Sequence, residues 1–85
     1  MEEYYWYNSC PVCNQGRLII TNDITNDRLY LHCEECEMGW LNPGDADNNK
    51  NGFLTLLVEF ETANPDLEFI KEKEWLSLAK YSFEE

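Results

Sequence analysis

The chain has 85 residues, and 17 acidic side chains against 6 basic ones give it a formal net charge of −11 at pH 7. Apolar residues make up 44% of the chain, which suffices for a modest core and argues against disorder throughout. Its length predicts a single domain over residues 1–85. A chain this acidic repels polyanions, so the charge argues against direct binding of nucleic acid and favours a basic protein partner or plain solubility.

No segment of the sequence is suited to a membrane or to secretion. The start of the chain, MEEYYWYNS, carries two glutamates and lacks the apolar run of a signal peptide. The longest apolar-rich run, residues 53–60, is far shorter than the roughly 20 residues that a membrane-spanning helix needs. We therefore expect a cytoplasmic protein without membrane contact, whose thiols stay reduced.

The first half of the chain predicts three strands. Tyr4, Tyr5, Trp6 and Tyr7 are consecutive, and we expect them to form a first strand that packs on the rest, with an exposed aromatic patch as the alternative. Residues 17–22 and 28–33 are rich in β-forming side chains and flank the turn-rich stretch DITND. These two strands are predicted to form a hairpin.

The second half predicts a loop, a strand and a helix. Residues 42–52 are almost all loop formers, whereas residues 53–61 alternate largely with period two and predict a further strand, with a helix as the alternative. Asn64 can cap a helix whose first position is Pro65, and we expect that helix over about residues 66–80.

The four cysteines form two pairs, CPVC and CEEC, that begin at Cys10 and Cys33. Nineteen residues separate Cys13 from Cys33, within the window expected for a four-cysteine metal site. Each pair also belongs to a C-x-x-C-x-x-G pattern, ending at Gly16 and Gly39. Such a turn often needs a positive φ after its second cysteine, at Asn14 and Glu37 here.

This pattern resembles the zinc-ribbon superfamily over about residues 8–41. The resemblance implies a β-hairpin with one structural Zn²⁺ per chain at its base, bound by Cys10, Cys13, Cys33 and Cys36. With the flanking elements, it predicts a small α+β fold with a three- to four-stranded antiparallel sheet and one C-terminal helix. Iron, as in rubredoxins, and disulfide or redox use are the alternatives to zinc. His32 is expected to point away from the metal.

Four cysteines close the coordination sphere of a zinc ion and leave no position for water or substrate. The chain has one histidine and neither a Gly-rich phosphate loop nor a Gly-x-Ser-x-Gly motif. We therefore expect a protein that is not an enzyme. Because Arg17 and Arg28 are the only Lys or Arg residues in the ribbon segment, phosphate binding is not expected either.

Acidic residues surround the second cysteine pair. If Glu34, Glu35 and Glu37 face solvent, they form an anionic turn, which Asp45 and Asp47 in the next loop extend. The turn is either a docking surface for a basic protein or a solvated surface without a partner.

Two functions are compatible with these features. In size and acidity the chain resembles the small acidic immunity proteins of bacterial polymorphic and contact-dependent toxin systems. This resemblance implies an inhibitor that neutralises a basic, nuclease-type toxin. The alternative is a zinc-ribbon adaptor that docks on the transcription or translation machinery. A small metal-dependent enzyme or redox protein is a third, weaker hypothesis.

Overall fold

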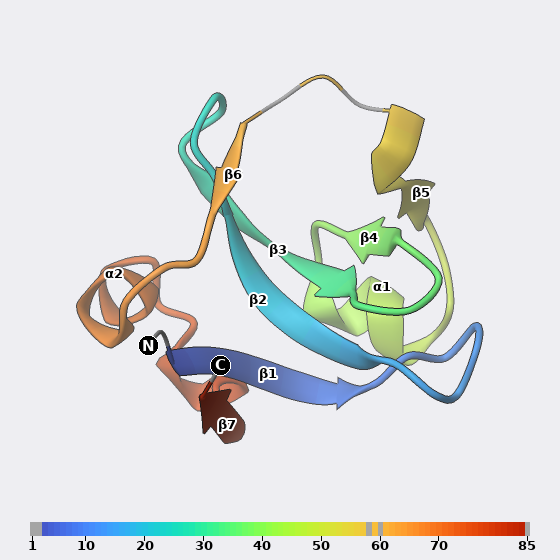
Figure 1. Cartoon of the computed structure of the whole chain (residues 1–85), viewed down its shortest axis with the longest axis horizontal. Helices are drawn as coiled ribbons and strands as arrows, with labels where there is room; N and C mark the ends of the chain where they lie inside the picture. The colour runs from blue at the N-terminus through green and yellow to red at the C-terminus, as the bar shows by residue number, and fades with distance from the viewer. Residues whose placement is uncertain (1–2, 58, 60, 85) are drawn as a thin grey trace.

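The computed structural model describes residues 3–57, 59 and 61–84. Its centre is one antiparallel sheet with the strand order β5-β4-β3-β2-β1-β7, in which β6 also pairs with β2 (Figure 1). The strands are β1 (Glu3–Ser9), β2 (Arg17–Asp23), β3 (Arg28–Cys33), β4 (Met38–Trp40), β5 (Phe53–Leu54), β6 (Thr62–Ala63) and β7 (Tyr81–Glu84). The α+β class is confirmed, but the prediction of three to four strands was wrong, since the sheet has seven.

The predicted hairpin is the middle of this sheet. β2 and β3 pair over a continuous register from Leu18 opposite Cys33 to Asp23 opposite Arg28. Because side chains alternate between the two faces of a strand, this register places Leu18, Ile20 and Leu31 together in the core, all at most 1% exposed. The β-forming side chains of the two segments therefore predicted the strands, and the pairing register determines which side chains share the buried face.

The turn between β2 and β3 is organised by one buried carboxylate. Asp23 is fully buried and accepts hydrogen bonds from the backbone N–H of Asn26 (3.1 Å), from Asn26 Nδ2 (2.8 Å) and from Arg28 Nε (2.8 Å). Burial alone raises the pKa of Asp23, but these hydrogen bonds outweigh it and the pKa is lowered. The charged carboxylate thus closes the hairpin.

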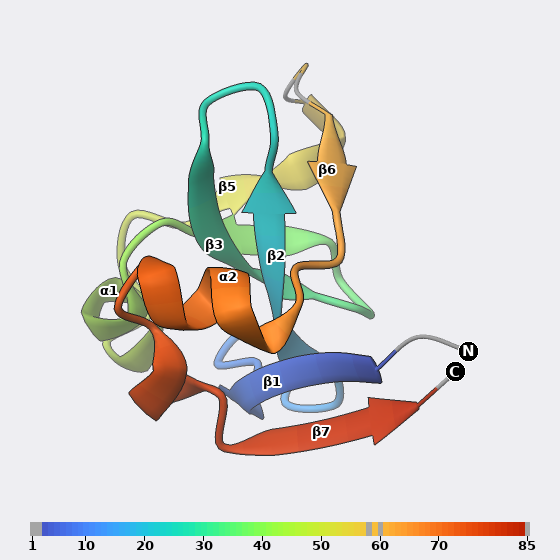
Figure 2. The same ribbon diagram turned by 90° about the vertical axis from the view of Figure 1, so that its left-hand side faces the viewer.

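The aromatic N-terminal segment forms β1, as predicted. Tyr5 and Tyr7 pack against the core from one face of the strand. β1 pairs with β2 on one side and with β7 on the other, where Tyr4 lies opposite Phe83 and Trp6 opposite Tyr81 (Figure 2). β7 lies in the segment where no strand was predicted.

The predicted loop at residues 42–52 contains a short helix, α1 (Pro43–Asp47). Asn42 caps it, its side chain accepting from the N–H of Gly44 at 2.8 Å, and Pro43 occupies the first position. Ala46 is 1% exposed, which anchors the helix on the core. The Asn-Pro start signal was present in the sequence, but the many loop formers around it favoured a loop.

The predicted strand at residues 53–61 was also wrong as a continuous element. It begins as β5 and then turns into the 3₁₀ helix η1 (Thr55–Leu57). Thr55 donates to the carbonyl of Glu37 from both its N–H (2.9 Å) and its hydroxyl (2.7 Å), which ties the chain to the turn before β4. Val58 and Phe60 of the predicted strand lie outside the described residues.

The predicted C-terminal helix is split into α2 (Leu67–Glu72) and the 3₁₀ helix η2 (Leu76–Leu78). The cap of α2 is Asp66, which accepts from the N–H of Phe69 at 2.8 Å, whereas Asn64 donates to the carbonyl of Glu3 instead. Helix α2 ends because Glu74 adopts a φ of 63°.

The end of α2 is a Schellman motif. The N–H of Trp75 donates to the carbonyl of Ile70 (2.9 Å), and that of Glu74 to the carbonyl of Lys71 (3.0 Å). Ile70 is fully buried, so the short helix is still held on the core. In the part of the chain that the structure describes, no helix is long and apolar enough to cross a bilayer.

Candidate metal centre

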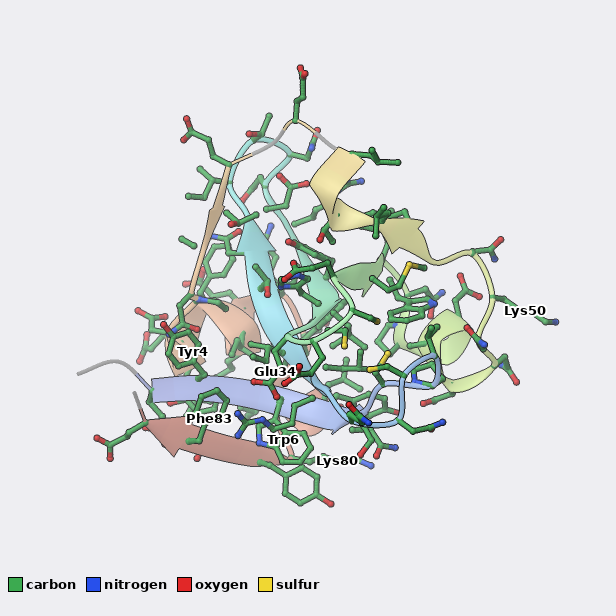
Figure 3. The ribbon with its side chains drawn as sticks, turned by 45° about the vertical axis from the view of Figure 1, so that its right-hand side comes forward. Tyr4, Trp6, Glu34, Lys50, Lys80 and Phe83 are labelled. Atoms are coloured by element: carbon green, nitrogen blue, oxygen red, sulfur yellow. The ribbon has the colours of Figure 1, made fainter. Side chains whose placement is uncertain are left out.

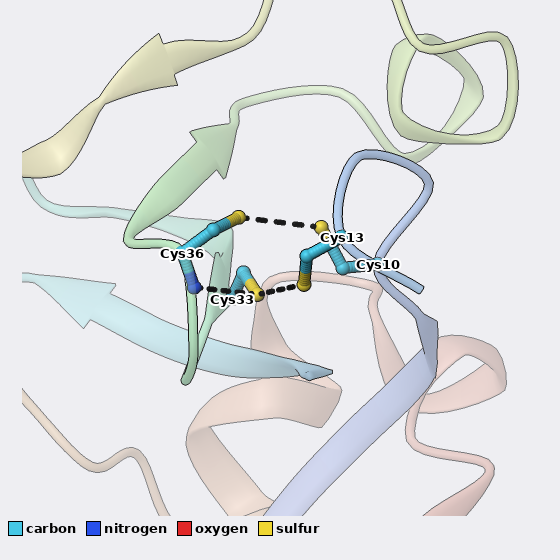
Figure 4. A group of neighbouring side chains, drawn as sticks. All are labelled: Cys10, Cys13, Cys33 and Cys36. Carbon is cyan, nitrogen blue, oxygen red and sulfur yellow. Dashed lines mark hydrogen bonds between the residues drawn. The ribbon is translucent and has the colours of Figure 1, made fainter. Parts of the chain in front are cut away.

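The four cysteines converge at one end of the β2–β3 hairpin (Figure 4). Cys10 and Cys13 follow β1, Cys33 ends β3, and Cys36 lies in the turn before β4. Their Sγ atoms all lie within 4.8 Å of one another, and the Cys10–Cys36 and Cys13–Cys33 sulfur pairs are both 3.6 Å apart. The cluster fits a zinc-ribbon-like site.

The size of the cluster matches a tetrahedral metal ion. Four sulfurs at about 2.3 Å from a zinc ion are about 3.8 Å from one another. The observed separations are close to that value and are far longer than the roughly 2.05 Å of a disulfide bond. The donor set therefore fits a tetrathiolate metal, and iron can use the same ligands.

Backbone amides support the sulfurs within each knuckle, the two C-x-x-C-x-x-G turns at residues 10–16 and 33–39. The N–H groups of Val12 and Gly16 donate to the sulfurs of Cys10 and Cys13, and that of Glu35 donates to Cys33, all at 3.4 Å. The N–H of Cys36 also donates to Cys33 at 3.4 Å. Such donors stabilise thiolates, the form that binds a metal.

The residue after each pair has the expected backbone conformation, with a φ of 57° at Asn14 and 64° at Glu37. Both glycines of the repeated pattern lie where neighbouring side chains leave no room for a Cβ atom. A Cβ atom at Gly16 would lie 2.5 Å from the sulfur of Cys33, and one at Gly39 would lie 2.9 Å from the ring of Phe53. Gly16 thus lets the first knuckle close around the sulfurs, whereas Gly39 leaves room for the side chains of Phe53 and Thr55.

The thiols differ in their electrostatic environment. Hydrogen bonds from the backbone of Gln15 and Gly16 lower the pKa of Cys13 to about 6. Burial raises the pKa of Cys33 to about 12. Because metals bind thiolates, a bound metal has to displace the proton of Cys33, whereas the backbone donors at Cys13 already favour its thiolate form.

His32 lies outside the sulfur cluster, as expected for a side chain on the strand beside Cys33. Its Nε2 atom is 2.7 Å from Oε2 of Glu37. Among the described residues, the group able to hold a metal consists of the four cysteines alone.

The five acidic residues predicted to form one anionic surface have different environments. Glu34 pairs with Arg17, and Glu37 pairs with His32. Asp47 is exposed and accepts from the hydroxyl of Tyr7 at 2.8 Å. The other two, Glu35 and Asp45, are exposed and half-buried respectively. Two of the three knuckle glutamates are therefore engaged within the chain.

Comparisons of the chain with protein-family models, with curated proteins and with solved structures found no match. The geometry of the sulfur cluster is therefore what supports the zinc-ribbon resemblance, whereas no match supports the resemblance to immunity proteins.

Sequence reasoning missed the environment of Arg17. Besides its pairing with Glu34, the guanidinium lies 3.8 Å from the ring centroid of Phe83 and 5.9 Å from that of Trp6. These residues come from β2, β7 and β1, and their proximity depends on the unpredicted strand β7. The sequence showed only that Arg17 carries one of the two basic charges of the ribbon segment.

Proposed function

We propose that Cys10, Cys13, Cys33 and Cys36 bind one structural Zn²⁺ per chain. The observation that carries this proposal is the cluster of four sulfurs within 4.8 Å, each pair of cysteines on a turn whose amides point at sulfur. The ligands close the coordination sphere, so the ion would hold the two knuckles together rather than activate a water molecule.

Elemental analysis of the purified protein tests the metal. We expect one zinc per chain and no stoichiometric iron. Cys13→Ser should lose the zinc and the cooperative unfolding transition, because metal binding and folding are linked. Val12→Ala is the matched control, since Val12 lies in the same knuckle, is 47% exposed and is not a ligand. A Cys13→Ser variant that stays folded without metal would refute the structural role.

We further propose that this acidic zinc protein acts by binding a basic protein, most naturally as an immunity or inhibitor protein of a nuclease-type toxin. The net charge of −11 supports this, because the active site of a nuclease attracts phosphate and a surface rich in carboxylates can compete for it. The alternative is an adaptor on the transcription or translation machinery, which the ribbon-like site would also suit.

Co-purification distinguishes these two functions. A stable complex with a basic nuclease domain encoded beside this chain, together with loss of its nuclease activity, would support the inhibitor. Recovery mainly with RNA polymerase or ribosomal proteins would support the adaptor instead.

The contribution of the acidic knuckle is tested best at Glu35, which is exposed, whereas Glu34 and Glu37 have partners within the chain. If the knuckle faces the partner, Glu35→Lys should slow association several-fold at low salt and reduce its salt dependence. Glu68→Lys, an exposed site on α2, makes the same change in net charge elsewhere. Equal effects of the two variants would remove the knuckle from the interface.

A further inference from the structure

Aromatic side chains form a cluster on one face of β1 and β7, where Figure 3 labels Tyr4, Trp6 and Phe83. The rings of Tyr4 and Phe83 are stacked with centroids 5.2 Å apart, and those of Trp6 and Tyr81 with centroids 4.5 Å apart. Each stacked pair is also a register pair of the two strands. We call these four side chains the aromatic face.

The aromatic face already holds one guanidinium group. Arg17 lies over the rings of Phe83 and Trp6, at 3.8 Å and 5.9 Å from their centroids. Its Nη2 donates to Oε1 of Glu34 at 2.9 Å and its Nε to Oε2 of the same carboxylate. This pairing neutralises the charge of Arg17, so the face presents rings to a partner and no uncompensated positive charge from this residue.

The outer side of the aromatic face is open. Tyr81 is 53% exposed although its ring stacks on Trp6. β7 is the last strand in the sheet order, and among the described residues it pairs with β1 alone. An edge strand offers backbone N–H and C=O groups to an added strand, and aromatic side chains at the same place offer a surface for its side chains.

The charge of the molecule decides what can occupy this face. A second copy of the chain also carries −11, and a nucleic acid is a polyanion, so both would be repelled. A cationic segment would be attracted, and the rings favour planar guanidinium groups over ammonium groups because guanidinium stacks and is less strongly hydrated. Arg17 is an example of this stacking within the molecule itself.

We propose that the aromatic face and the free edge of β7 form a docking site for an extended, arginine-bearing segment of a basic protein. The segment adds to β7 as a strand, and one of its guanidinium groups stacks on the ring of Tyr81, the exposed member of the aromatic face. That the partner is basic rests on the proposed function. The docking site places the centre of the interface at β1 and β7 instead of at the acidic knuckle.

The test uses the full zinc-loaded chain and two synthetic peptides of equal length and charge. One alternates Arg with Thr and the other alternates Lys with Thr. Affinity is measured by calorimetry at physiological ionic strength, and the site is mapped by amide chemical shifts. We expect the Arg peptide to bind at least fivefold tighter than the Lys peptide, with the largest shifts at residues 81–84.

Two variants of Tyr81 distinguish stacking on its ring from attraction to the overall negative charge of the protein. Tyr81→Ala should weaken binding of the Arg peptide about fivefold and change binding of the Lys peptide little. Tyr81→Phe keeps the ring and should bind as the parent protein does. Leu57→Ala alters another strongly exposed apolar side chain, which is 79% exposed, and should have no effect.

Three other outcomes would contradict the docking site, and each points to a different alternative. Equal affinity for the two peptides, or shifts centred on Glu35, would place the basic partner elsewhere and leave the proposed function standing. Failure of both peptides to bind even at low salt would overturn the docking site, and the basic-partner part of the proposed function with it. Concentration-dependent dimerisation that shifts residues 81–84 would assign the edge of β7 to a second copy.

Discussion

The hairpin region, residues 17–40, and the C-terminal region, residues 53–84, are built in different ways. In the hairpin region, β2 and β3 pair over six consecutive residue pairs, and the knuckle that follows contributes two sulfurs to the metal cluster. In the C-terminal region, β5 and β6 are two residues each, and the longest helix has six residues. Neighbouring segments stabilise each other in the first region, whereas contacts with distant residues hold the second in place.

Of the changes considered, removal of the metal should have the largest effect on the stability of the two regions. The apparent binding free energy of a structural zinc is about 10–16 kcal/mol, more than the stability of most small domains. We expect a chelator at pH 7 to abolish amide protection in both regions, because Cys10 and Cys33 belong to the same core as Ile70 of α2. Hydrogen exchange with mass spectrometry measures this. Protection that persists in residues 66–84 would show that the C-terminal region folds independently.

A substitution at Asp23 tests the stability of the hairpin region without changing a metal ligand. Asp23→Asn removes the buried charge that faces Arg28, and we expect it to lower the free energy of unfolding by about 2 kcal/mol. This loss is smaller than the loss expected when a fully buried ion pair is broken, because the Arg28 side chain is 42% exposed. Denaturant unfolding of the zinc-loaded protein measures the loss.

The pH dependence of this loss follows from the lowered pKa of Asp23. A carboxyl whose pKa is lower in the folded state contributes stability above its unfolded pKa of about 3.9 and loses it only as the pH falls through the folded pKa. The difference between parent and variant should therefore be constant from pH 7 to pH 5. Asp27→Asn is the control, because the side chain of Asp27 is 80% exposed, and it should cost less than about 0.5 kcal/mol.

The smallest expected effect lies at the end of α2 and has the opposite sign. Glu74 has a φ of 63°, in the region that glycine adopts most readily. Glu74→Gly should raise the free energy of unfolding by about 0.5 kcal/mol, because relief of the left-handed conformation exceeds the added chain entropy of glycine. Thermal unfolding measures the gain. Glu72→Gly, at the last helical residue, should instead lower the free energy of unfolding by about 0.5 kcal/mol. A loss at both sites would contradict this account of the helix end.

The same difference between regions explains what the sequence could predict. The metal ligands follow from the spacing of the four cysteines, and β2 and β3 follow from two runs of β-forming side chains that flank a turn-rich stretch. The positive φ at Asn14 and Glu37 was also expected, because a tight turn over two cysteines needs it. Each of these is recognised from a short motif or from the spacing between two motifs.

The rest depended on tertiary contacts that no motif in the sequence marks. The four residues of β7 are too few to show a period, and β7 is a strand because β1 lies beside it. The chain at residues 53–57 leaves its strand because Thr55 bonds to Glu37. The pairing of Arg17 with Glu34, which engages one of the predicted docking acids, depends on how β2 and the second knuckle meet. Local patterns carry no signal for such contacts.

The pairing of β1 with β7 has a consequence for how the chain can be rewired. Glu3 lies opposite Glu84, so the two ends of the described chain lie next to each other (Figure 2). A short peptide linker should therefore join them without disturbing the sheet, and new ends could be opened in the exposed turn at residues 48–51. Such a circular permutant would turn β1 and β7 into a local hairpin and shorten the loop that their pairing must close.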